Sequence, residues 1–263
     1  MARWLITGVS SGIGAALARL ALDAGDSVVG TVRNAAAAGA FESLAPTRAR
    51  AVLLDVTDEA AVSATVATLL AEAPIDILVN NAGQSLFGAF EEVSVAELGA
   101  LFAVNLFGPW AVTQSVLPHF RACGSGRIIF LSSGCGLNGI PGLSAYCATK
   151  HAVEGAAEAL AQEVAGFGIQ VMIVEPGAVA SRFISHGTQD TGRRLPDYAG
   201  LTGGGKDALE GYYESAASSP DAVAAAIHTA ATSPDMPARL LIGADVKPGA
   251  EAKGLALLDL ARR

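Results

Sequence analysis

Short runs rich in β-branched residues alternate with longer, alanine-rich segments of helical period along most of this 263-residue chain. This alternation is typical of successive βαβ units, which build a parallel sheet with helices on both faces. Seven strands are predicted, near residues 3–7, 27–32, 50–55, 75–80, 126–132, 169–175 and 239–243. Helices are predicted near residues 12–24, 58–73, 95–121, 144–167 and 220–232. Right-handed crossovers wind such a sheet in both directions, so we expect a doubly wound α/β fold with ligands at the carboxyl ends of its strands.

The length of the chain fits one α/β domain that spans residues 1–263. One stretch, residues 177–219, interrupts the alternation, because it has no strong period and contains GLTGGGK. It is either a surface insertion or a flexible lid. Since it follows the carboxyl end of a strand, and long loops in compact domains are usually functional, we interpret residues 177–219 as a lid over the substrate.

Composition excludes several classes of function. The net charge is −8 and no basic run is present, which disfavours non-specific attraction to nucleic acid or to an anionic membrane. Cys123, Cys135 and Cys147 form no CxxC spacing and the four histidines show no ligand spacing, so neither a disulfide framework nor a metal site is expected. Without a signal-like start or a run of about 18 apolar residues, the sequence predicts a cytoplasmic protein with no membrane partner.

The first predicted strand runs directly into a glycine-rich turn, TGVSSGIG, from Thr7 to Gly14. Glycine permits the tight passage from strand to helix and a close approach of the backbone to a ligand. The helix that follows would present free N–H groups and the positive end of its dipole to a pyrophosphate. The strand before the turn and the helix after it distinguish this turn from a merely tight connection. We assign six of its residues to cofactor binding: Gly8, Ser10, Ser11, Gly12, Ile13 and Gly14.

Tyr146 and Lys150 stand four residues apart in SAYCATKHAVEG, within a predicted helix. Residues at this spacing share one helix face, with Cβ atoms about 5–6 Å apart. A free phenol has a pKa of ~10, and lowering it by roughly 2–3 units requires ~3–4 kcal/mol. One ammonium at about 4 Å supplies ~4 kcal/mol at an effective dielectric constant near 20. A tyrosine acid/base activated by a lysine is therefore physically sufficient, although YxxxK alone also fits a core tyrosine and a solvated lysine.

Several motifs together resemble the short-chain dehydrogenase/reductase family, in its compact single-domain branch. They are the turn TGVSSGIG, the segment NNAG at residues 80–83, Ser133 after the strand RIIFLS, and the pair Tyr146 and Lys150. The segment LSSGCGLNGIPGLSAYCATKHAVEG is similar to the 17β-hydroxysteroid-dehydrogenase-like group. The resemblance implies a Rossmann-type fold, a nicotinamide dinucleotide and exchange of hydride with a carbonyl or alcohol substrate.

The resemblance also implies catalytic roles. Tyr146 would be the acid/base, and Lys150 would activate it and bind the nicotinamide ribose. Ser133, rather than its neighbour Ser132, would hold the substrate oxygen. Asn105 would hold a water of the proton relay behind Lys150, although an asparagine inside a helix could instead bond to backbone.

Further cofactor contacts are implied by the same resemblance. Besides Tyr146 and Lys150, they fall at Asp55 and Val56, at Asn81, Ala82 and Gly83, and at Pro176, Gly177, Val179 and Ser181. Ser181 stands where threonine is usual in the family, which leaves its contact with the carboxamide open.

The end of the second predicted strand bears on the choice of cofactor. An acid there binds the ribose 2′-OH of NAD, whereas a cation accommodates the 2′-phosphate of NADP. This chain ends the strand with TVR, and its nearby acids, Asp23 and Asp26, precede the strand. Arg33 could be an ordinary solvated arginine, but the missing acid favours NADP(H) over NAD(H).

We therefore predict an NADP(H)-dependent enzyme that interconverts a ketone or aldehyde and an alcohol, on a lipophilic small molecule. Residues that could line its pocket, or equally the core, are Leu86, Phe87, Leu137, Ile140, Leu143, Phe183 and Tyr198. A 3-oxoacyl thioester reductase would use the same catalytic residues, and a catalytically silent nucleotide-binding regulator is the alternative outside enzymes. Small residues at helical spacing on the helix near 144–167, through which family members commonly pair, predict a homodimer or homotetramer.

Overall fold

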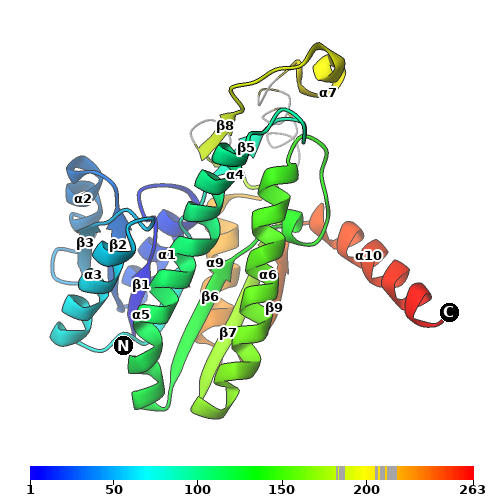
Figure 1. The fold of residues 1–263 in the computed structure, drawn as a ribbon. Helices are drawn as coiled ribbons and strands as arrows, with labels where there is room; N and C mark the ends of the chain where they lie inside the picture. Colours follow the sequence, from blue (N-terminus) through cyan, green and yellow to red (C-terminus); the bar gives the residue numbers. More distant parts are fainter. Residues whose placement is uncertain (182, 184–186, 205–206, 208–210, 212–217) are drawn as a thin grey trace.

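The computed structural model describes residues 1–181, 183, 187–204, 207, 211 and 218–263. Its centre is a sheet of seven parallel strands in the order β3-β2-β1-β4-β6-β7-β9 (Figure 1). These strands are β1 (Arg3–Ile6), β2 (Ser27–Val32), β3 (Ala49–Leu53), β4 (Ile77–Asn80), β6 (Gly126–Leu131), β7 (Ile169–Pro176) and β9 (Arg239–Ile242). They are the predicted strands, with ends displaced by at most two residues. The strand order reverses between β1 and β4, which confirms the doubly wound Rossmann-type fold.

Helices cover both faces of the sheet, because successive strand residues point to opposite faces. On one face, Trp4 and Ile6 share a core with α1 (Gly12–Asp23) and α9 (Pro220–Thr232). On the other face, Leu5 shares a core with three helices: α3 (Glu59–Glu72), α5 (Gly108–Cys123) and α6 (Ser144–Val164). The strands accordingly read as continuous apolar runs, as expected of a parallel sheet that is buried on both faces.

The structure adds elements that the sequence pattern does not predict. They are α2 (Ala35–Glu42), α7 (Ala199–Thr202), α10 (Val246–Ala261), and a second sheet in which β5 (Ser85–Phe87) pairs with β8 (Thr188–Asp190). Helix α2 buries only Phe41 and α10 buries only Val246, so neither has the periodic apolar face by which a helix is found. The strands β5 and β8 have three residues each, too few to show an alternating pattern.

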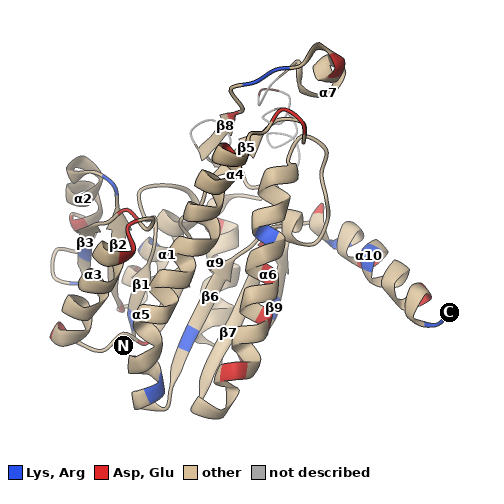
Figure 2. Ribbon diagram, viewed as in Figure 1, with Lys and Arg blue, Asp and Glu red and all other residues tan. Residues whose placement is uncertain are grey.

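The helix predicted near 95–121 is divided into α4 (Val95–Phe102), a π-helical turn (Ala103–Phe107) and α5. Between Glu97 and Arg121 the segment has no Lys, Arg, Asp or Glu, and α5 is nearly free of charge in Figure 2. By length and composition alone, Val95–Cys123 could cross a membrane, a test that core helices of soluble proteins also pass. Here α5 packs on the sheet through Val112, Val116 and Phe120.

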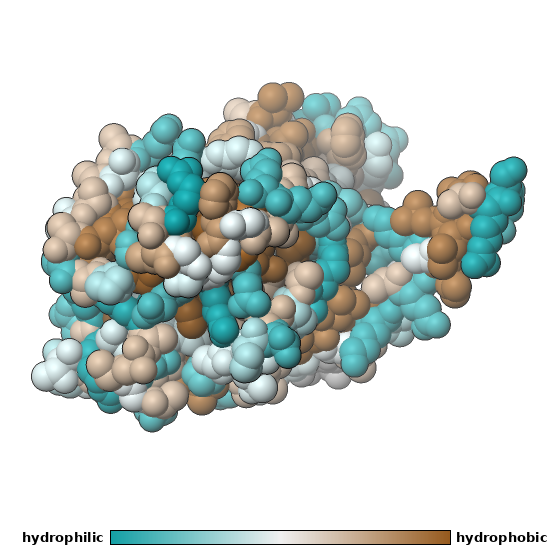
Figure 3. Space-filling view, turned by 90° about the horizontal axis from the view of Figure 1, so that it is seen from below, coloured by the Kyte–Doolittle hydropathy of each residue, from teal (hydrophilic) through white to brown (hydrophobic). Residues whose placement is uncertain are grey.

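Helix α10 leaves the body of the domain as an arm (Figure 1). At its base Val246 is buried against Gly134, and Lys253 donates a hydrogen bond to the carbonyl oxygen of Leu137. The outer half carries apolar surface, visible where the arm stands clear of the body in Figure 3. Four of its side chains are more than half exposed: Leu255, Leu257, Leu258 and Leu260.

Candidate active site

The turn between β1 and α1 is shaped to receive a phosphate. Gly8 and Gly12 have φ angles of 76° and 62°, a left-handed conformation that favours glycine. Ser11 precedes α1 with an extended backbone, and its side chain makes no capping hydrogen bond. The first N–H groups of α1 are therefore open to an anion, where the helix dipole also favours one. These residues fit the pyrophosphate of a dinucleotide.

Side chains from β1 and β4 hold the turn in this shape. Asn81 Nδ2 donates to the carbonyl oxygens of Thr7 at 2.8 Å and Gly8 at 2.9 Å. Thr7 Oγ1 accepts from the N–H groups of Asn81 at 2.9 Å and Ala82 at 3.0 Å. A Cβ on Gly14 would lie 2.3 Å from both Asn81 Nδ2 and the Gly8 carbonyl oxygen. Glycine is thus required at position 14 by the close approach of β4, as well as by any ligand.

Arg33 and Asp55 follow the paired strands β2 and β3, and both are exposed. The N–H and hydroxyl of Thr57 donate to Asp55 Oδ1 at 2.9 and 2.8 Å. These two hydrogen bonds hold the pKa of Asp55 below its ordinary value, and the nearby Arg33 charge lowers it further. Val56 is buried. The predicted adenosine end of the site therefore presents Arg33 as a solvent-facing cation at the edge of the sheet.

Tyr146 and Lys150 lie together on α6 at the carboxyl edge of the sheet. Lys150 Nζ is 5.6 Å from the centre of the Tyr146 ring. Both residues are buried: Lys150 is only 6% exposed and Tyr146 only 7%. Nζ donates to the carbonyl oxygen of Leu131, at the end of β6, at 2.6 Å. Burial lowers the pKa of Lys150 to about 8. Lys150 Nζ and Asn105 Oδ1 both face Gly83, 3.9 and 3.4 Å from the position its Cβ would take.

Asn105 lies on the π-helical turn and is buried. Its Nδ2 donates to the Gln84 carbonyl oxygen at 2.9 Å and to Thr149 Oγ1 at 3.0 Å, and its Oδ1 accepts from the Gln84 N–H at 2.9 Å. The side chain therefore bonds to backbone, as the alternative interpretation expects. The Asn105 carbonyl lacks an α-helical donor, because Pro109, four residues on, has no N–H. A carbonyl oxygen in this position can accept a hydrogen bond from a water.

Ser133 follows β6 and begins the 3-10 turn Gly134–Gly136, which packs on α6. Its Oγ accepts from the Cys135 N–H at 3.2 Å. Cys135 belongs to the same apolar cluster as Tyr146, so the turn places Ser133 beside the Tyr146 end of α6. Ser132 is buried and its Oγ faces Gly136. Of the two serines, Ser133 is the more exposed.

The loop after β7 reaches the glycine-rich turn. The Gly177 N–H donates to the Ile242 carbonyl oxygen at 2.8 Å, and the Ala178 N–H donates to Asp245 Oδ2 at 2.7 Å. Ser181 Cβ and Oγ lie 3.7 and 3.9 Å from where a Cβ of Gly12 would be. Pro176 and Val179 are buried. Two predicted cofactor-binding segments are therefore in contact, although part of the predicted lid, including 182 and 184–186, lies outside the described residues.

Apolar side chains surround Tyr146. Its ring centre is 6.0 Å from that of Phe183, and Leu86, Phe87 and Leu143 belong to the same cluster. The other three residues predicted to line a pocket, Leu137, Ile140 and Tyr198, lie outside this cluster. Tyr146 therefore stands at the junction of a polar cofactor edge and an apolar region.

Residues 3–191 match the family model of the short chain dehydrogenases. The chain belongs to the short-chain dehydrogenase/reductase family. It is 41% identical over 185 residues to the oxidoreductase claN of Passalora fulva, covering 70% of this chain and 85% of that protein. It is 40% identical over 188 residues to 17-beta-hydroxysteroid dehydrogenase type 1 of Mus musculus, covering 68% of this chain and about half, 54%, of that protein. The predicted family and its similarity to the 17β-hydroxysteroid-dehydrogenase group are confirmed, and the chain is an oxidoreductase.

Solved structures of the family agree with this assignment. A short-chain dehydrogenase from Streptomyces avermitilis is 40% identical, with a TM-score of 0.89 over 99% of this chain and 93% of that chain. A metagenomic short-chain oxidoreductase in complex with NADP is 28% identical, with a TM-score of 0.72 over 92% of this chain and 96% of that chain. The chain thus has structural neighbours that bind NADP.

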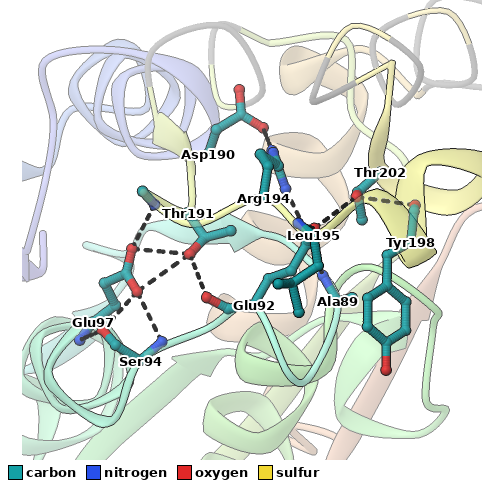
Figure 4. Close-up of polar contacts among 11 residues, drawn as sticks. Ala89, Glu92, Ser94, Glu97, Asp190, Thr191, Arg194, Leu195, Tyr198 and Thr202 are labelled. Carbon is teal, nitrogen blue, oxygen red and sulfur yellow. Dashed lines mark hydrogen bonds and ion pairs between the residues drawn. The ribbon is translucent and has the colours of Figure 1, made fainter.

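Residues 188–202 form an outer wall beside the apolar cluster, and most of this wall lies beyond the part that matches the family model. The wall is joined to β5 by strand pairing and by the Thr191 N–H, which donates to the Phe87 carbonyl oxygen at 3.0 Å. Glu92, only 1% exposed, anchors it (Figure 4). Its carboxylate accepts from the N–H groups of Leu195 and Ala89, both at 2.9 Å, from Thr202 Oγ1 at 3.2 Å and from Arg194 at 3.1 Å.

A second carboxylate, Glu97, fixes the beginning of the outer wall. It accepts from Thr191 Oγ1 at 3.0 Å and the Gly192 N–H at 2.9 Å while it caps α4 with Ser94. The Ser94 hydroxyl and the Gly192 N–H hold the pKa of Glu97 at about 2. The Leu195 N–H likewise holds the pKa of Glu92 below its ordinary value. Depressed pKa values mean that these contacts are fully present at neutral pH and weaken only in acid.

We expect Glu92→Gln to raise the KM of the substrate several-fold and to leave the Kd for NADPH unchanged. A glutamine would turn an NH₂ donor toward the N–H of Leu195 or Ala89, so the outer wall would loosen. Steady-state kinetics, calorimetry and hydrogen exchange of residues 188–202 measure these effects. The matched control is Glu91→Gln, which keeps an acceptor for the Tyr198 hydroxyl. Equal KM changes in both variants would contradict an anchoring role for Glu92.

Sequence reasoning missed several residues that shape the site. They are Thr7, Glu92, Glu97, Thr149 and Asp245, each of which bonds to a segment distant in sequence. A buried acid can be suspected where it stands among apolar residues, as Glu92 does in FGAFEEVSV. The sequence does not indicate which distant N–H groups it will bind.

Proposed function

We propose that this oxidoreductase is NADP(H)-dependent and interconverts a ketone or aldehyde and an alcohol, with Tyr146 as the acid/base. The observation that carries the proposal is the buried pair of Tyr146 and Lys150 at the carboxyl edge of the sheet. A buried tyrosine that only packs does not need an ammonium beside its ring. The pair also lies next to the turn of Ser133, where the proton and the substrate oxygen can meet.

In the direction of reduction, Tyr146 gives its phenolic proton to the substrate oxygen, which Ser133 Oγ holds in place. The Lys150 ammonium stabilises the phenolate that remains. The proton is replaced from solvent past Lys150, where the Asn105 carbonyl offers an acceptor for a relaying water. The nicotinamide, when bound, supplies the hydride in reduction and accepts it in oxidation. Oxidation of the alcohol reverses each proton transfer.

Two features support a dinucleotide and, more particularly, NADP(H). The open amino end of α1 and the left-handed glycines at 8 and 12 suit a pyrophosphate. Arg33 is an exposed cation at the end of β2, where a 2′-phosphate would be read, and a neighbour in the family binds NADP.

The environment of Tyr146 supports a lipophilic substrate. Leu86, Phe87, Leu143 and Phe183 gather at the ring, and a relative with 40% identity is a 17-beta-hydroxysteroid dehydrogenase. A 3-oxoacyl thioester could also present its keto group to Tyr146, so assays with both substrate classes are needed to distinguish a lipophilic ketone from a thioester. A silent nucleotide-binding regulator would bind the cofactor without turnover.

A spectrophotometric panel tests the proposal. Steroid ketones, long-chain ketones, 3-oxoacyl thioesters and their alcohols would be assayed with NADPH and NADH in parallel. We expect turnover of an apolar ketone with NADPH, absent in Tyr146→Phe. Preference for the thioesters would favour the second substrate class, and binding of NADPH without any turnover would favour the regulator.

We expect the chain to form a homodimer or homotetramer. Phe107, the last residue of the π-helical turn, and Trp110 on α5 are 60% and 57% exposed. Along the neighbouring helix α6, Ala148, Gly155 and Ala159 are exposed and small, so another helix could approach closely. Light scattering at micromolar concentration measures the mass. A monomer under these conditions, or a Trp110→Glu variant that keeps the wild-type mass, would contradict pairing through this surface.

A further inference from the structure

A cluster of acids surrounds Arg239 one turn behind the catalytic lysine. Arg239, on β9, donates to Glu154 Oε2 at 2.8 Å and also contacts Glu175 on β7 and Glu158 on α6. The Glu175 side chain is fully buried and that of Glu154 is 8% exposed, whereas that of Glu158 is 56% exposed. Three carboxylates thus share one guanidinium, and two of them are inside the protein.

The cluster cannot hold all its negative charge at low energy. Burial raises the pKa of Glu175 to about 7, and the charge of Glu154 contributes to the rise. Glu175 can therefore take up a proton near neutral pH. Glu154 holds the hydrogen bond of Arg239.

Glu154 stands one helical turn after Lys150, on the same face of α6. The Lys150 ammonium is buried, which lowers its pKa to about 8, and the groups that oppose this effect are Cys135 and Glu154. The pKa of Cys135 is raised above its ordinary value by its hydrogen bond with Cys147 and by burial. Its thiol is therefore neutral in the neutral range. The same hydrogen bond lowers the pKa of the partner thiol, Cys147, to about 7. Besides this thiol pair, Glu154 is the carboxylate whose charge acts on Lys150.

The other groups around Lys150 Nζ provide no counter-charge. They are the carbonyl oxygen of Leu131, the Tyr146 ring and, across Gly83, the amide of Asn105. The second oxygen of Glu154 faces the serine turn: Glu154 Oε1 and Ser132 Oγ lie 2.7 and 2.4 Å from where a Cβ of Gly136 would be. Neither atom has a hydrogen-bond partner in the described part of the chain. The free oxygen of the carboxylate thus faces the turn of Ser133, while its Cα lies one helical turn after Lys150 on α6.

We propose that Glu154 is a positioning residue for the proton relay, whose carboxylate, held by Arg239, keeps the buried Lys150 ammonium charged. Glu175 serves the same end by taking up the proton that three crowded acids require. The role rests on the proposed function, because Lys150 must be charged to lower the pKa of Tyr146. Glu154 itself takes part in neither the hydride transfer nor the proton transfer.

The test is a direct titration of Lys150 by NMR with ¹³Cε-labelled lysine. The chain has four lysines, so the Lys150 signal is identified by its absence in Lys150→Arg. We expect Glu154→Gln to move the titration midpoint of Lys150 down by about one pH unit or more, since it removes the negative charge one helical turn away. Glu154→Asp should restore most of the wild-type midpoint.

Glu158→Gln is the matched control, because it removes an exposed partner of the same Arg239 one turn farther from Lys150. It should leave the midpoint in place. No shift in folded Glu154→Gln, or the same shift in Glu158→Gln, overturns the proposal. The titration needs no turnover, so it can succeed or fail independently of the substrate panel that tests the proposed function.

A second measurement addresses Glu175 and needs no activity either. Because the folded protein raises the pKa of Glu175 from about 4.5 to about 7, its stabilising contribution is full below the lower value. It is lost as the pH rises through the higher value. Urea unfolding at about pH 5 and about pH 8 should therefore show a smaller loss of stability in Glu175→Gln than in wild type. An equal loss in the two proteins would show that Glu175 does not take up the proton.

Discussion

Replacing Tyr146 by phenylalanine is expected to lower turnover by about two to four orders of magnitude, the usual contribution of a positioned acid/base. The change removes the hydroxyl with its transferable proton, while the ring keeps its contacts with Phe183 and the surrounding cluster. The protein should stay folded and bind NADPH as before. Stopped-flow and steady-state assays with the best substrate of the panel measure the loss.

Lys150→Ala completes this test. It should lower turnover and also weaken cofactor binding, since Lys150 is predicted to bind the nicotinamide ribose as well as to activate the tyrosine. If turnover falls in Tyr146→Phe but not in Lys150→Ala, Lys150 does not activate the tyrosine. Tyr146→Phe with more than about a tenth of wild-type turnover would remove Tyr146 from the mechanism.

Arg33→Ala is expected to raise the Kd for NADPH tenfold to a hundredfold and to leave that for NADH nearly unchanged. A guanidinium engages a 2′-phosphate through charge-assisted hydrogen bonds, and losing such bonds costs about 1.5–3 kcal/mol. Arg33 is exposed at the end of β2, so its removal opens no cavity. Titration calorimetry with both cofactors gives the two constants.

Arg19→Ala is the matched control for net charge. Arg19 is a second exposed arginine, on α1, whose side chain lies 4.0 Å from Asp221. It should leave both Kd values unchanged. Arg33 would be an ordinary surface residue if the wild-type protein preferred NADH. The same conclusion would follow if Arg33→Ala raised the Kd values for NADPH and NADH equally.

The sequence predicts what one element can determine by itself. The central strands are buried on both faces, so each contains an apolar run that no helix period obscures, whereas the edge strands β3 and β9 are only partly buried. Tyr146 and Lys150 lie on one helix, and the helix fixes their separation. Residues Gly8 to Gly14 form one turn, and the glycines in its sequence indicate where the backbone is left-handed. The fold, the Tyr146–Lys150 pair and the glycine-rich turn could therefore be predicted from residue spacing within single elements.

Contacts between segments that are distant in sequence could not be predicted from local spacing. Glu92 binds the N–H of Leu195, 103 residues away, and Asp245 binds that of Ala178, 67 residues away. Such pairings depend on how loops meet after the sheet has formed. The π-helical turn at Asn105 was missed for another reason, since Pro109 in a helical pattern indicates a disturbance without specifying its form.

The arm formed by α10 has a mechanical consequence. Sixteen residues of α-helix make a stiff rod about 24 Å long. Its near end touches Gly134, which follows Ser133, and comes directly after Asp245, which holds the loop after β7. We therefore expect a tilt imposed at Leu260 to reach the turn of Ser133 and the loop after β7. Truncations, fusions or surface tethers on α10 should be checked for effects on the candidate active site before their activity data are interpreted.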